Sequence, residues 1–297
     1  MVKKLLEKEW DICIFVKKVV SLQRIMELRV ALYRAKSWLR HQLTAWNTGG
    51  EGVHSPYLFE WVRMVMMDKN SFYIWGEIER CREKMLRDER ELEFVDYGSG
   101  KLKGENGKLK GENGERRKVC DIARRSLAKR KYAQMLSRLV NWLGASHRLE
   151  NGSGTAYSLE FRGLTIVELG TSLGVTTAYM AAMDSRNRVV TFEGCEAVAN
   201  IAKENWKALN INNIECRIGK IDVEQLAQDI EHLDVAFIDA NHTYVSTCEY
   251  FDVLAGKVRE KSVIVVDDIH YSEEMEKAWK AICADERVTS TIDLYQM

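Results

Sequence analysis

Several features that define other protein classes are scarce or absent in this chain. Its 297 residues include one proline and seven cysteines, an odd number without any Cys-x-x-Cys pair, and no apolar run approaches 18 residues. The cysteine pattern argues against a disulfide framework and against a zinc site. The missing apolar run predicts no membrane span, and the amino terminus has no apolar core with a cleavage site behind it. We therefore expect a cytoplasmic protein with reduced thiols.

The net charge of the whole chain is zero, but its two parts carry opposite net charges. Residues 1–163 carry 32 basic against 21 acidic residues, a net charge of +11, whereas residues 164–297 carry 12 against 23, a net charge of −11. The simpler interpretation is two solvated faces of opposite sign that attract each other. The alternative is that the basic part meets an anionic partner.

The clearest pattern in the chain is a strand, a glycine turn and a helix over residues 165–183. Residues 165–169 are apolar and β-branched, Gly170 and Gly174 bracket the turn, and apolar residues then recur at helical spacing. Such a unit brings the backbone close to a nucleotide-like ligand at the carboxyl end of a sheet. Ser172 stands where a dinucleotide-binding loop has its second glycine, so the turn suits a ligand without pyrophosphate, such as S-adenosylmethionine.

After this unit, strands and helices alternate. We expect strands at residues 188–193, 214–218, 234–239 and 262–267, and helices at residues 196–209, 223–231, 244–258 and 272–284. This alternation implies right-handed crossovers and an α/β fold with a doubly wound, mostly parallel sheet. Ligands then bind beyond the carboxyl ends of the strands. Glu193 ends the second strand, where an acid can accept hydrogen bonds from ribose hydroxyls.

The amino-terminal part is predicted to be a helical, basic extension over residues 1–130, followed by the main domain over residues 131–297. Ser55 as N-cap and Pro56 at the first helical position open one of its helices. His54 beside this cap is a weak site candidate. Helices are expected over residues 1–48, 56–67, 77–92 and 132–143, the last one ending at Gly144, and residues 93–100 are strand-like. A perfect seven-residue repeat at residues 100–114 is predicted to be a mobile, solvated loop, and the first helices are a candidate homodimer contact.

Three aspartates follow neighbouring predicted strands. Asp239 ends one strand, and Asp267 and Asp268 end the next. Converging carboxylates repel each other unless one is protonated or a hard cation such as Mg²⁺ binds, although the acids can instead cap helices or lie apart in water. His242 and His270 follow these acids and are candidate general bases, with His242 the better one because it lies three residues after Asp239.

Together these motifs resemble the class I S-adenosylmethionine-dependent methyltransferases. The resemblance rests on VELGTSLG at residues 167–174, Glu193, FIDANH at residues 237–242, VVDD at residues 265–268 and KYAQML at residues 131–136. Within that class the chain is most similar to the O-methyltransferases of the catechol and caffeoyl-CoA type. The similarity covers about residues 130–297 and matches the doubly wound pattern read from the alternating elements.

The resemblance also implies roles for individual residues. The implied cofactor-binding residues are Glu168, Gly170, Thr171, Ser172, Gly174, Glu193, Gly219 and Asp239. The implied Mg²⁺ ligands are Asp239, Asp267 and Asp268, and the implied catalytic residues are Asp239 and His242. Two positions depart from the family: Asp268 stands in place of the usual asparagine, and His242 in place of the usual basic lysine.

The predicted activity is transfer of a methyl group from S-adenosylmethionine to an oxygen of a small molecule. One alternative is a methyltransferase-like binding protein without catalysis. Another is an RNA methyltransferase that uses the basic residues 116–131, but the Asn/Asp-Pro-Pro-Tyr/Phe motif common in N-methylating nucleic-acid enzymes is absent after Asp239. Nucleic acid is therefore the less favoured partner.

The last predicted strand covers residues 288–294, where side chains alternate in polarity. The resemblance implies a further antiparallel strand after it, and the chain stops at Met297. We therefore expect that the domain lacks its last strand, leaving an exposed sheet edge.

Overall fold

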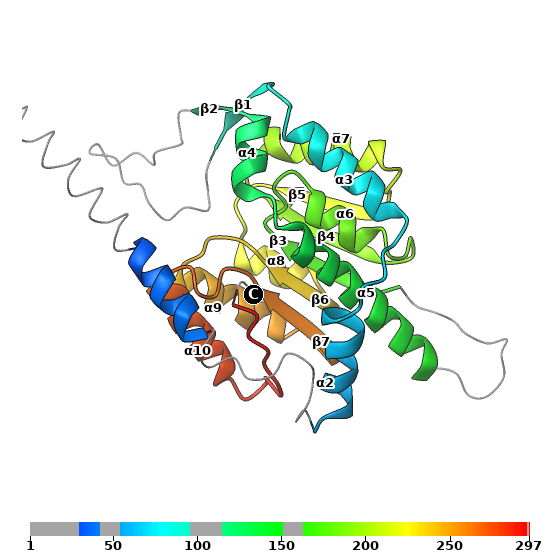
Figure 1. Ribbon diagram of the computed structural model, residues 1–297, viewed down its shortest axis with the longest axis vertical. Coiled ribbons are helices and arrows are strands. Elements are labelled where there is room, and N and C mark those ends of the chain that lie inside the picture. The colour runs from blue at the N-terminus through cyan, green and yellow to red at the C-terminus, as the bar shows by residue number, and fades with distance from the viewer. Residues whose placement is uncertain (1–29, 42–53, 96–114, 151–162, 296) are drawn as a thin grey trace, which may run out of the picture.

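The structure is a computed structural model that describes residues 30–41, 54–95, 115–150, 163–295 and 297 (Figure 1). Its centre is a sheet of five parallel strands in the order β5-β4-β3-β6-β7. The strands are β3 (Thr165–Leu169), β4 (Arg188–Glu193), β5 (Ile214–Ile218), β6 (Leu233–Ile238) and β7 (Val258–Val266). The strand order reverses between β3 and β6, as in a doubly wound sheet. The predicted fold class is confirmed.

Helices cover both faces of the sheet because side chains alternate along each strand. Ile166 of β3 packs in a core with α5 (Arg130–Glu150), and the adjacent Val167 packs on the other face with α9 (Tyr244–Ala255). The Ile166 side of the sheet is also covered by α6 (Val175–Ala181) and α7 (Glu196–Ala208). The Val167 side is also covered by α8 (Val223–Asp229) and α10 (Glu273–Cys283). All five strands therefore end at one edge, between the two helix layers.

The amino-terminal part packs onto this domain. Residues 30–41 form a helix that lies beside α10 (Figure 1), and the other residues of the predicted helix 1–48 lie outside the described part. As predicted, the Ser55 side chain caps a helix that starts at Pro56; α2 (Pro56–Trp61) continues into a π-helical turn, η1 (Val62–Met66).

The predicted surface helix over residues 77–92 is partly wrong. The helix is α3 (Ile74–Met85), and it buries Trp75, Ile78 and Met85 against α6 and α7. A hairpin follows, in which β1 (Glu91–Phe94) pairs antiparallel with β2 (Glu115–Lys118). Charged residues at positions 86–92 favour a helix by themselves. Residues 91–94 nevertheless form a strand, because they pair with residues 115–118 further along the chain.

The repeat and its neighbours, residues 96–114, lie outside the described residues. After β2 comes α4 (Val119–Ser126), whose Val119 and Ile122 join the same core as α3. Residues from both sides of the predicted boundary at residue 130 therefore share one core.

The predicted end of the long helix and the predicted last strand are wrong, and β7 begins at Val258 rather than at residue 262. The long helix does not end at Gly144, because α5 continues to Glu150; a single glycine inside a helix costs only about 1 kcal/mol. Residues 288–294 do not form a strand. Their polar groups bond elsewhere: the Leu294 N–H donates to the Met297 carbonyl, and Asp293 contacts His270.

No helix in the described ranges combines the length and apolar character needed to cross a bilayer. All six cysteines in those ranges are free thiols.

Candidate active site

The predicted glycine turn follows β3 directly and requires glycine at its first position. Gly170 has φ +103°, and a β-carbon there would lie 2.2 Å from the backbone oxygen of Asp239. The Asp239 N–H in turn donates to the Leu169 carbonyl at 2.8 Å. The turn after β3 and the acid after β6 are therefore held in contact by backbone alone.

The end of the turn is equally close-packed. Gly174 has φ +75°, and a β-carbon there would lie 2.6 Å from Trp206 Nε1 on α7. The Trp206 indole donates to the Gly174 carbonyl at 2.8 Å. The start of α6 is thereby fixed against α7, and its first turn opens towards the carboxyl edge of the sheet.

Glu193 lies beside this turn, as predicted for an acid at the end of β4. Its Oε2 accepts from the Ser172 N–H at 2.7 Å, and its Oε1 accepts from the Cys195 N–H at 2.9 Å. Ser172 adopts a left-handed conformation, φ 50°, to make this contact. The Glu193 carboxylate is thereby held beside the glycine turn at the carboxyl edge of the sheet.

Two other members of the predicted cofactor-binding set are buried beneath the turn. Glu168 is fully buried, and its Oε2 accepts from Thr177 Oγ1 and Thr191 Oγ1. Thr171 is 3% exposed and bonds the same Thr191 hydroxyl at 2.6 Å. Burial raises the pKa of Glu168 to about 7. Among the described atoms its Oε1 has no hydrogen-bond partner.

Gly219 follows β5 and has φ +125°, with its N–H bonded to the Glu193 carbonyl at 2.8 Å. A β-carbon at this position would meet no atom within 4 Å. Open space therefore lies next to the backbone that carries Glu193.

The acids after β6 and β7 converge with His242. His242 Nε2 lies 3.5 Å from Asp239 Oδ1 and 4.0 Å from Asp268 Oδ2. Both loops contain a left-handed residue, Asn241 and Asp268, each with φ 55°. Backbone conformations of this kind cluster at functional sites.

The pKa values of Asp239 and His242 in this cluster are shifted in opposite directions. Burial raises the pKa of Asp239 well above its usual range, and the nearby charges of Asp267 and Asp268 raise it further. Burial lowers the pKa of His242, against the opposing effect of Asp268. The neutral imidazole therefore predominates near pH 7 beside acids that repel one another.

Asp267 is 7% exposed, and its Oδ1 accepts the N–H of Asp268 at 2.9 Å. A hard cation would relieve the repulsion among these carboxylates, so their chemistry fits Mg²⁺. The ligand atoms of all three aspartates do not, however, approach within 4.8 Å of one another; in the described chain that closeness is reached by His41, His270 and Asp293. The predicted roles of the three aspartates thus stay predictions.

The two weaker histidine candidates lie elsewhere. His270 bonds Asp293 and Glu276. His54 is exposed at the start of α2.

Two contacts were missed by sequence reasoning. Ser126, at the end of α4, lies 2.6 Å from the Ser172 hydroxyl, so the amino-terminal part borders the glycine turn. The Tyr271 ring lies tilted beside His242, with ring centroids 5.8 Å apart, and Arg34 of the first helix lies over the Tyr271 ring, 4.1 Å from its centre. No local pattern in the sequence relates residues so far apart.

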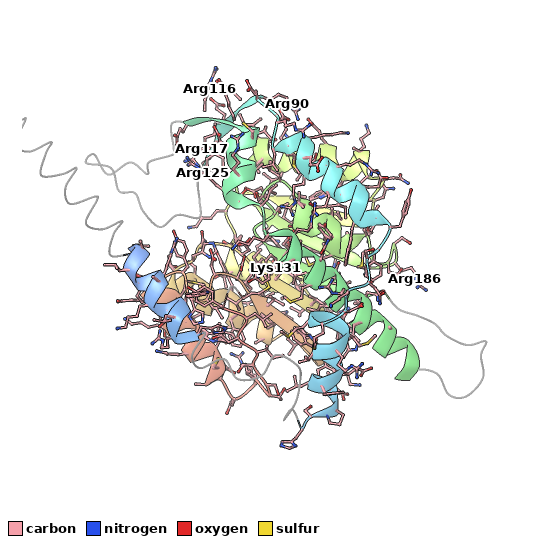
Figure 2. All side chains as sticks on the ribbon, in the orientation of Figure 1. Arg90, Arg116, Arg117, Arg125, Lys131 and Arg186 are labelled. Carbon is pink, nitrogen blue, oxygen red and sulfur yellow. The ribbon has the colours of Figure 1, made fainter. Side chains whose placement is uncertain are left out.

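The first part of the basic stretch at residues 116–131 lies at the β1–β2 and α4 end of the molecule, where Figure 2 labels Arg116, Arg117 and Arg125, whereas Lys131 lies nearer the middle, on α5. Several of its arginines have acidic partners: Arg117 with Glu115 at 2.9 Å and Arg124 with Asp121 at 2.8 Å. Charge neutralised by neighbouring acids contributes little to binding nucleic acid.

Comparison with known proteins agrees with this geometry. Residues 167–269 match the model of a family described as methyltransferase domain. The predicted resemblance to methyltransferases is confirmed over these residues, which run from β3 to the loop after β7.

One curated relative is the O-methyltransferase imqG of Aspergillus flavus, 32% identical over 111 residues. The match covers 35% of this chain, and the chain spans 44% of that relative. An O-methyltransferase from Bacillus cereus, solved with SAH, is 20% identical, with 79% of this chain and 89% of that chain covered and a TM-score of 0.47. TomG from Streptomyces achromogenes, an O-methyltransferase solved with SAM, is 13% identical, with 73% and 80% covered and a TM-score of 0.45.

Proposed function

We propose that this protein transfers a methyl group from S-adenosylmethionine to a hydroxyl of a small molecule. The observation that carries the proposal is the meeting of the glycine turn, Glu193 and the Asp239–His242 pair at one edge of the sheet. The methyltransferase match over residues 167–269 supports it.

The glycine turn and Glu193 would hold the cofactor. The backbone of Gly170 lies against the Asp239 backbone without a side chain between them, and two N–H donors fix the Glu193 carboxylate beside the turn, where an acid can bind ribose hydroxyls. Open space next to Gly219 suits an adenine. S-adenosylmethionine, when bound, supplies an electrophilic methyl group on a sulfonium.

His242 would act as the general base for the acceptor. In the displacement the acceptor oxygen bonds the methyl carbon, the carbon–sulfur bond breaks with its electrons going to sulfur, and the hydroxyl proton passes to Nε2 of His242. Its lowered pKa keeps the imidazole neutral before the reaction, and the Asp268 carboxylate, with Oδ2 4.0 Å from Nε2, stabilises the imidazolium formed. The protein otherwise contributes alignment of donor and acceptor.

Mg²⁺ is the cation that Asp239, Asp267 and Asp268 would hold. When bound it would lower the pKa of an acceptor hydroxyl and offset the repulsion that raises the pKa of Asp239.

We also propose a cytoplasmic location, in keeping with the free thiols of the described cysteines. A homodimer through the amino-terminal helices remains part of the proposal.

Calorimetric titration with S-adenosylmethionine, with and without Mg²⁺, tests the cofactor assignment. Glu193→Ala is expected to weaken binding by tenfold or more, because a charge-assisted hydrogen bond contributes ~1.5–3 kcal/mol. Glu196→Ala removes an exposed carboxylate three residues away and is the matched control. Equal affinity of the Glu193 and Glu196 variants would remove Glu193 from the site.

A binding protein without catalysis would bind the cofactor equally well, so turnover separates the two classes. Catechols and other small phenols are the first acceptors to assay, by release of S-adenosylhomocysteine. His242→Ala should lower the rate by roughly 10²–10⁴-fold with little change in cofactor affinity. Turnover on RNA but on none of these phenols would favour the RNA alternative instead.

A further inference from the structure

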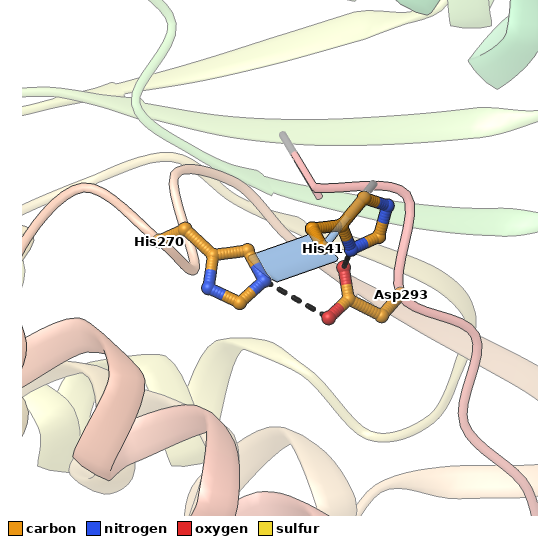
Figure 3. Close-up of side chains that lie close together, drawn as sticks. All are labelled: His41, His270 and Asp293. Carbon is orange, nitrogen blue, oxygen red and sulfur yellow. Dashed lines mark hydrogen bonds and ion pairs between the residues drawn. The ribbon is translucent and has the colours of Figure 1, made fainter. Parts of the chain in front are cut away.

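A second cluster of titratable side chains lies outside the candidate active site and joins three segments of the chain (Figure 3). His41 comes from the helix at residues 30–41, His270 from the loop between β7 and α10, and Asp293 from the final segment. His270 Nε2 lies 2.9 Å from Asp293 Oδ2, and His41 Nδ1 lies 3.5 Å from Asp293 Oδ1. One ligand atom from each residue lies within 4.8 Å of the other two.

We propose that His41, His270 and Asp293 bind a divalent transition metal such as Zn²⁺. Two imidazoles and one carboxylate are a common ligand set for zinc, with a fourth position open to water. Zinc–ligand distances of ~2.0–2.1 Å in a tetrahedron place ligand atoms about 3.3 Å apart. The separations of 2.9 Å to Asp293 Oδ2 and 3.5 Å to Asp293 Oδ1 are close to that value, and one ligand atom from each residue lies within 4.8 Å of the others, so side-chain rotations that draw these atoms together would complete the site.

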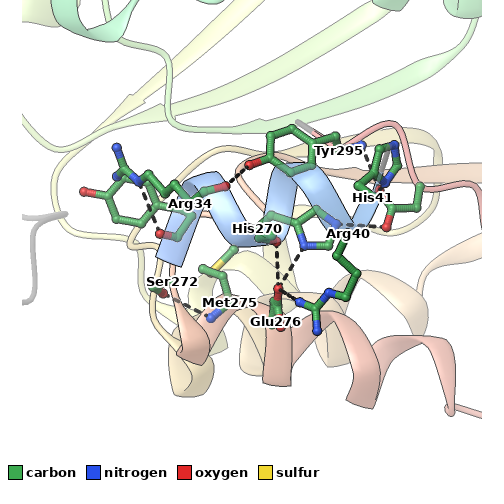
Figure 4. Close-up of polar contacts among 11 residues, drawn as sticks. Arg34, Arg40, His41, His270, Ser272, Met275, Glu276 and Tyr295 are labelled. Carbon is green, nitrogen blue, oxygen red and sulfur yellow. Dashed lines mark hydrogen bonds and ion pairs between the residues drawn. The ribbon is translucent and has the colours of Figure 1, made fainter. Parts of the chain in front are cut away.

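The surroundings of His270 match those of a metal ligand (Figure 4). Its other ring nitrogen, Nδ1, lies 3.3 Å from Glu276 Oε1 on α10. With Nδ1–H donating to this carboxylate, Nε2 can coordinate a metal once the metal displaces the proton that Nε2 now shares with Asp293. Glu276 is itself fixed, since its Oε1 also accepts from Ser37 Oγ at 3.0 Å and from Arg40 at 2.8 Å.

The cluster is also accessible. A cavity of about 490 Å³ is lined by all three proposed ligands and by Glu276. The side chains of His41 and His270 are 15% and 13% exposed, whereas Asp293 is 34% exposed. The two imidazoles are thus held by packing, while the cavity gives an ion a way in.

Bound metal would cross-link the first helix, the loop after β7 and the last segment. The same loop carries Asp268 and Tyr271, which border the candidate active site, and Tyr295 next to Asp293 donates to the Arg34 carbonyl at 2.9 Å. The ion would therefore fix the position of Arg34 over Tyr271. This role does not depend on the methyl transfer proposed above.

Competition of the chelator-treated full chain with a chromophoric zinc chelator tests the site. The protein should bind one Zn²⁺ that His41→Ala and His270→Ala lose, and thermal unfolding should show a Zn²⁺-dependent rise in Tm in the parent but not in these two variants. Glu276→Gln should weaken binding by about 10–100-fold, the usual cost of losing an outer-shell partner. His54→Ala, which removes an exposed histidine that is not part of the cluster, should behave like the parent protein.

If His41→Ala does not fold, His41→Gln is used in its place, because glutamine keeps a hydrogen-bond donor for Asp293. Excess Mg²⁺ should not displace the Zn²⁺, because Mg²⁺ prefers oxygen ligands. Three results would each overturn the proposal: no Zn²⁺ binding by the parent protein, equal Zn²⁺ affinity of the parent and His41→Gln, or displacement by Mg²⁺. In those cases the cluster is a hydrogen-bonded contact that fastens the first helix.

Discussion

At the scale of single residues, Glu168 is unusual because it is an acidic side chain that is completely buried. Its carboxyl is fully buried under the glycine turn, and burial raises its pKa from 4.5 to about 7, despite two threonine hydroxyls that donate to it. A proton is therefore retained in the folded state at a pH where the unfolded chain has lost it. That difference corresponds to roughly 3 kcal/mol.

Glu168 should accordingly make the folded protein less stable as pH rises. Its folded pKa is the higher one, so the contribution to stability is largest below pH 4.5 and declines until about pH 7. Glu168→Gln removes the ionisation, so the variant should gain roughly 2–3 kcal/mol relative to the parent between pH 5 and pH 8. Urea unfolding at the two pH values measures this gain. A difference between the proteins that does not change with pH would contradict it.

Gly170 and Gly219 form a matched pair for testing the turn. Both have positive φ, +103° and +125°, so alanine is strained at either position. Only at Gly170 would the β-carbon also collide with backbone, the oxygen of Asp239. Gly170→Ala should therefore destabilise by at least ~1 kcal/mol more than Gly219→Ala. Urea unfolding of both variants checks this, and equal losses would show that the turn can move away from β6.

At the scale of elements, one buried carboxylate ties three helices together. Glu79 of α3 accepts from the Tyr179 hydroxyl of α6 at 2.7 Å, from Arg130 of α5 at 2.8 Å and from Arg82 at 3.1 Å. These donors lower its pKa although burial alone would raise it. The arrangement fixes the amino-terminal helices relative to the sheet.

Removing this carboxylate should be costly, because it leaves the largely buried Arg82 without its acid. Glu79→Ala is expected to destabilise by about 3–5 kcal/mol. Tyr179→Phe, which deletes a single hydrogen bond, should cost about 1.5–3 kcal/mol. Glu83→Ala, an exposed position on the same helix, should stay within about 0.5 kcal/mol of the parent. Thermal and urea unfolding compare the three; a loss below 1 kcal/mol for Glu79→Ala would show that the helices hold without it.

Elements with a strong local pattern were predictable from the sequence. The strands Thr165–Leu169, Arg188–Glu193 and Ile214–Ile218 match the predicted bounds, since buried parallel strands are short apolar runs closed by glycine or acid. Errors fall where a distant partner decides. The strand β1 forms because β2 pairs with it, and residues 288–294 stay irregular because their polar groups bond His270 and the chain end.

At the scale of the whole molecule, the opposite charges of the two parts agree with the simpler interpretation. Ion pairs join them: Arg40 contacts Glu276 at 2.8 Å, and Arg90 contacts Glu204 at 2.9 Å. The Arg90 pair is exposed and contributes little by itself. The long-range field of +11 against −11 nonetheless favours docking of the amino-terminal part over binding to a separate anion.

The residues that follow the strands of the sheet were predictable, because the strands themselves were. Parallel strands must end at one edge, so the sequence alone brings Glu193, Asp239 and Asp268 together. It did not indicate the His41, His270 and Asp293 cluster, because each of these residues comes from a segment without motif spacing to the others. It also did not separate Glu168 and Thr171, which lie in the core, from Glu193, which is partly exposed beside the glycine turn.

The shared core predicts that the methyltransferase-like part does not fold well alone. Trp75, Ile78 and Val119 are 0–5% exposed and pack against Leu173 and Tyr179 beside the glycine turn. Burying side chains of this size contributes about 1.5–3 kcal/mol each, so losing the three removes roughly 5 kcal/mol or more. Total stabilities are ~5–15 kcal/mol.

A chain that starts at Lys131 should therefore be largely unfolded or melt well below the full chain, and it should lose cofactor binding with its fold. Circular dichroism and thermal unfolding measure the difference. Deleting residues 107–113, one copy of the repeat between β1 and β2, is the matched control, because shortening a loop by seven residues changes closure entropy by only about 0.6 kcal/mol or less. If the short chain melted at the temperature of the full one, residue 130 would be a true domain boundary, and the contacts of α3 and α4 with α6 and α7 would contribute no stability.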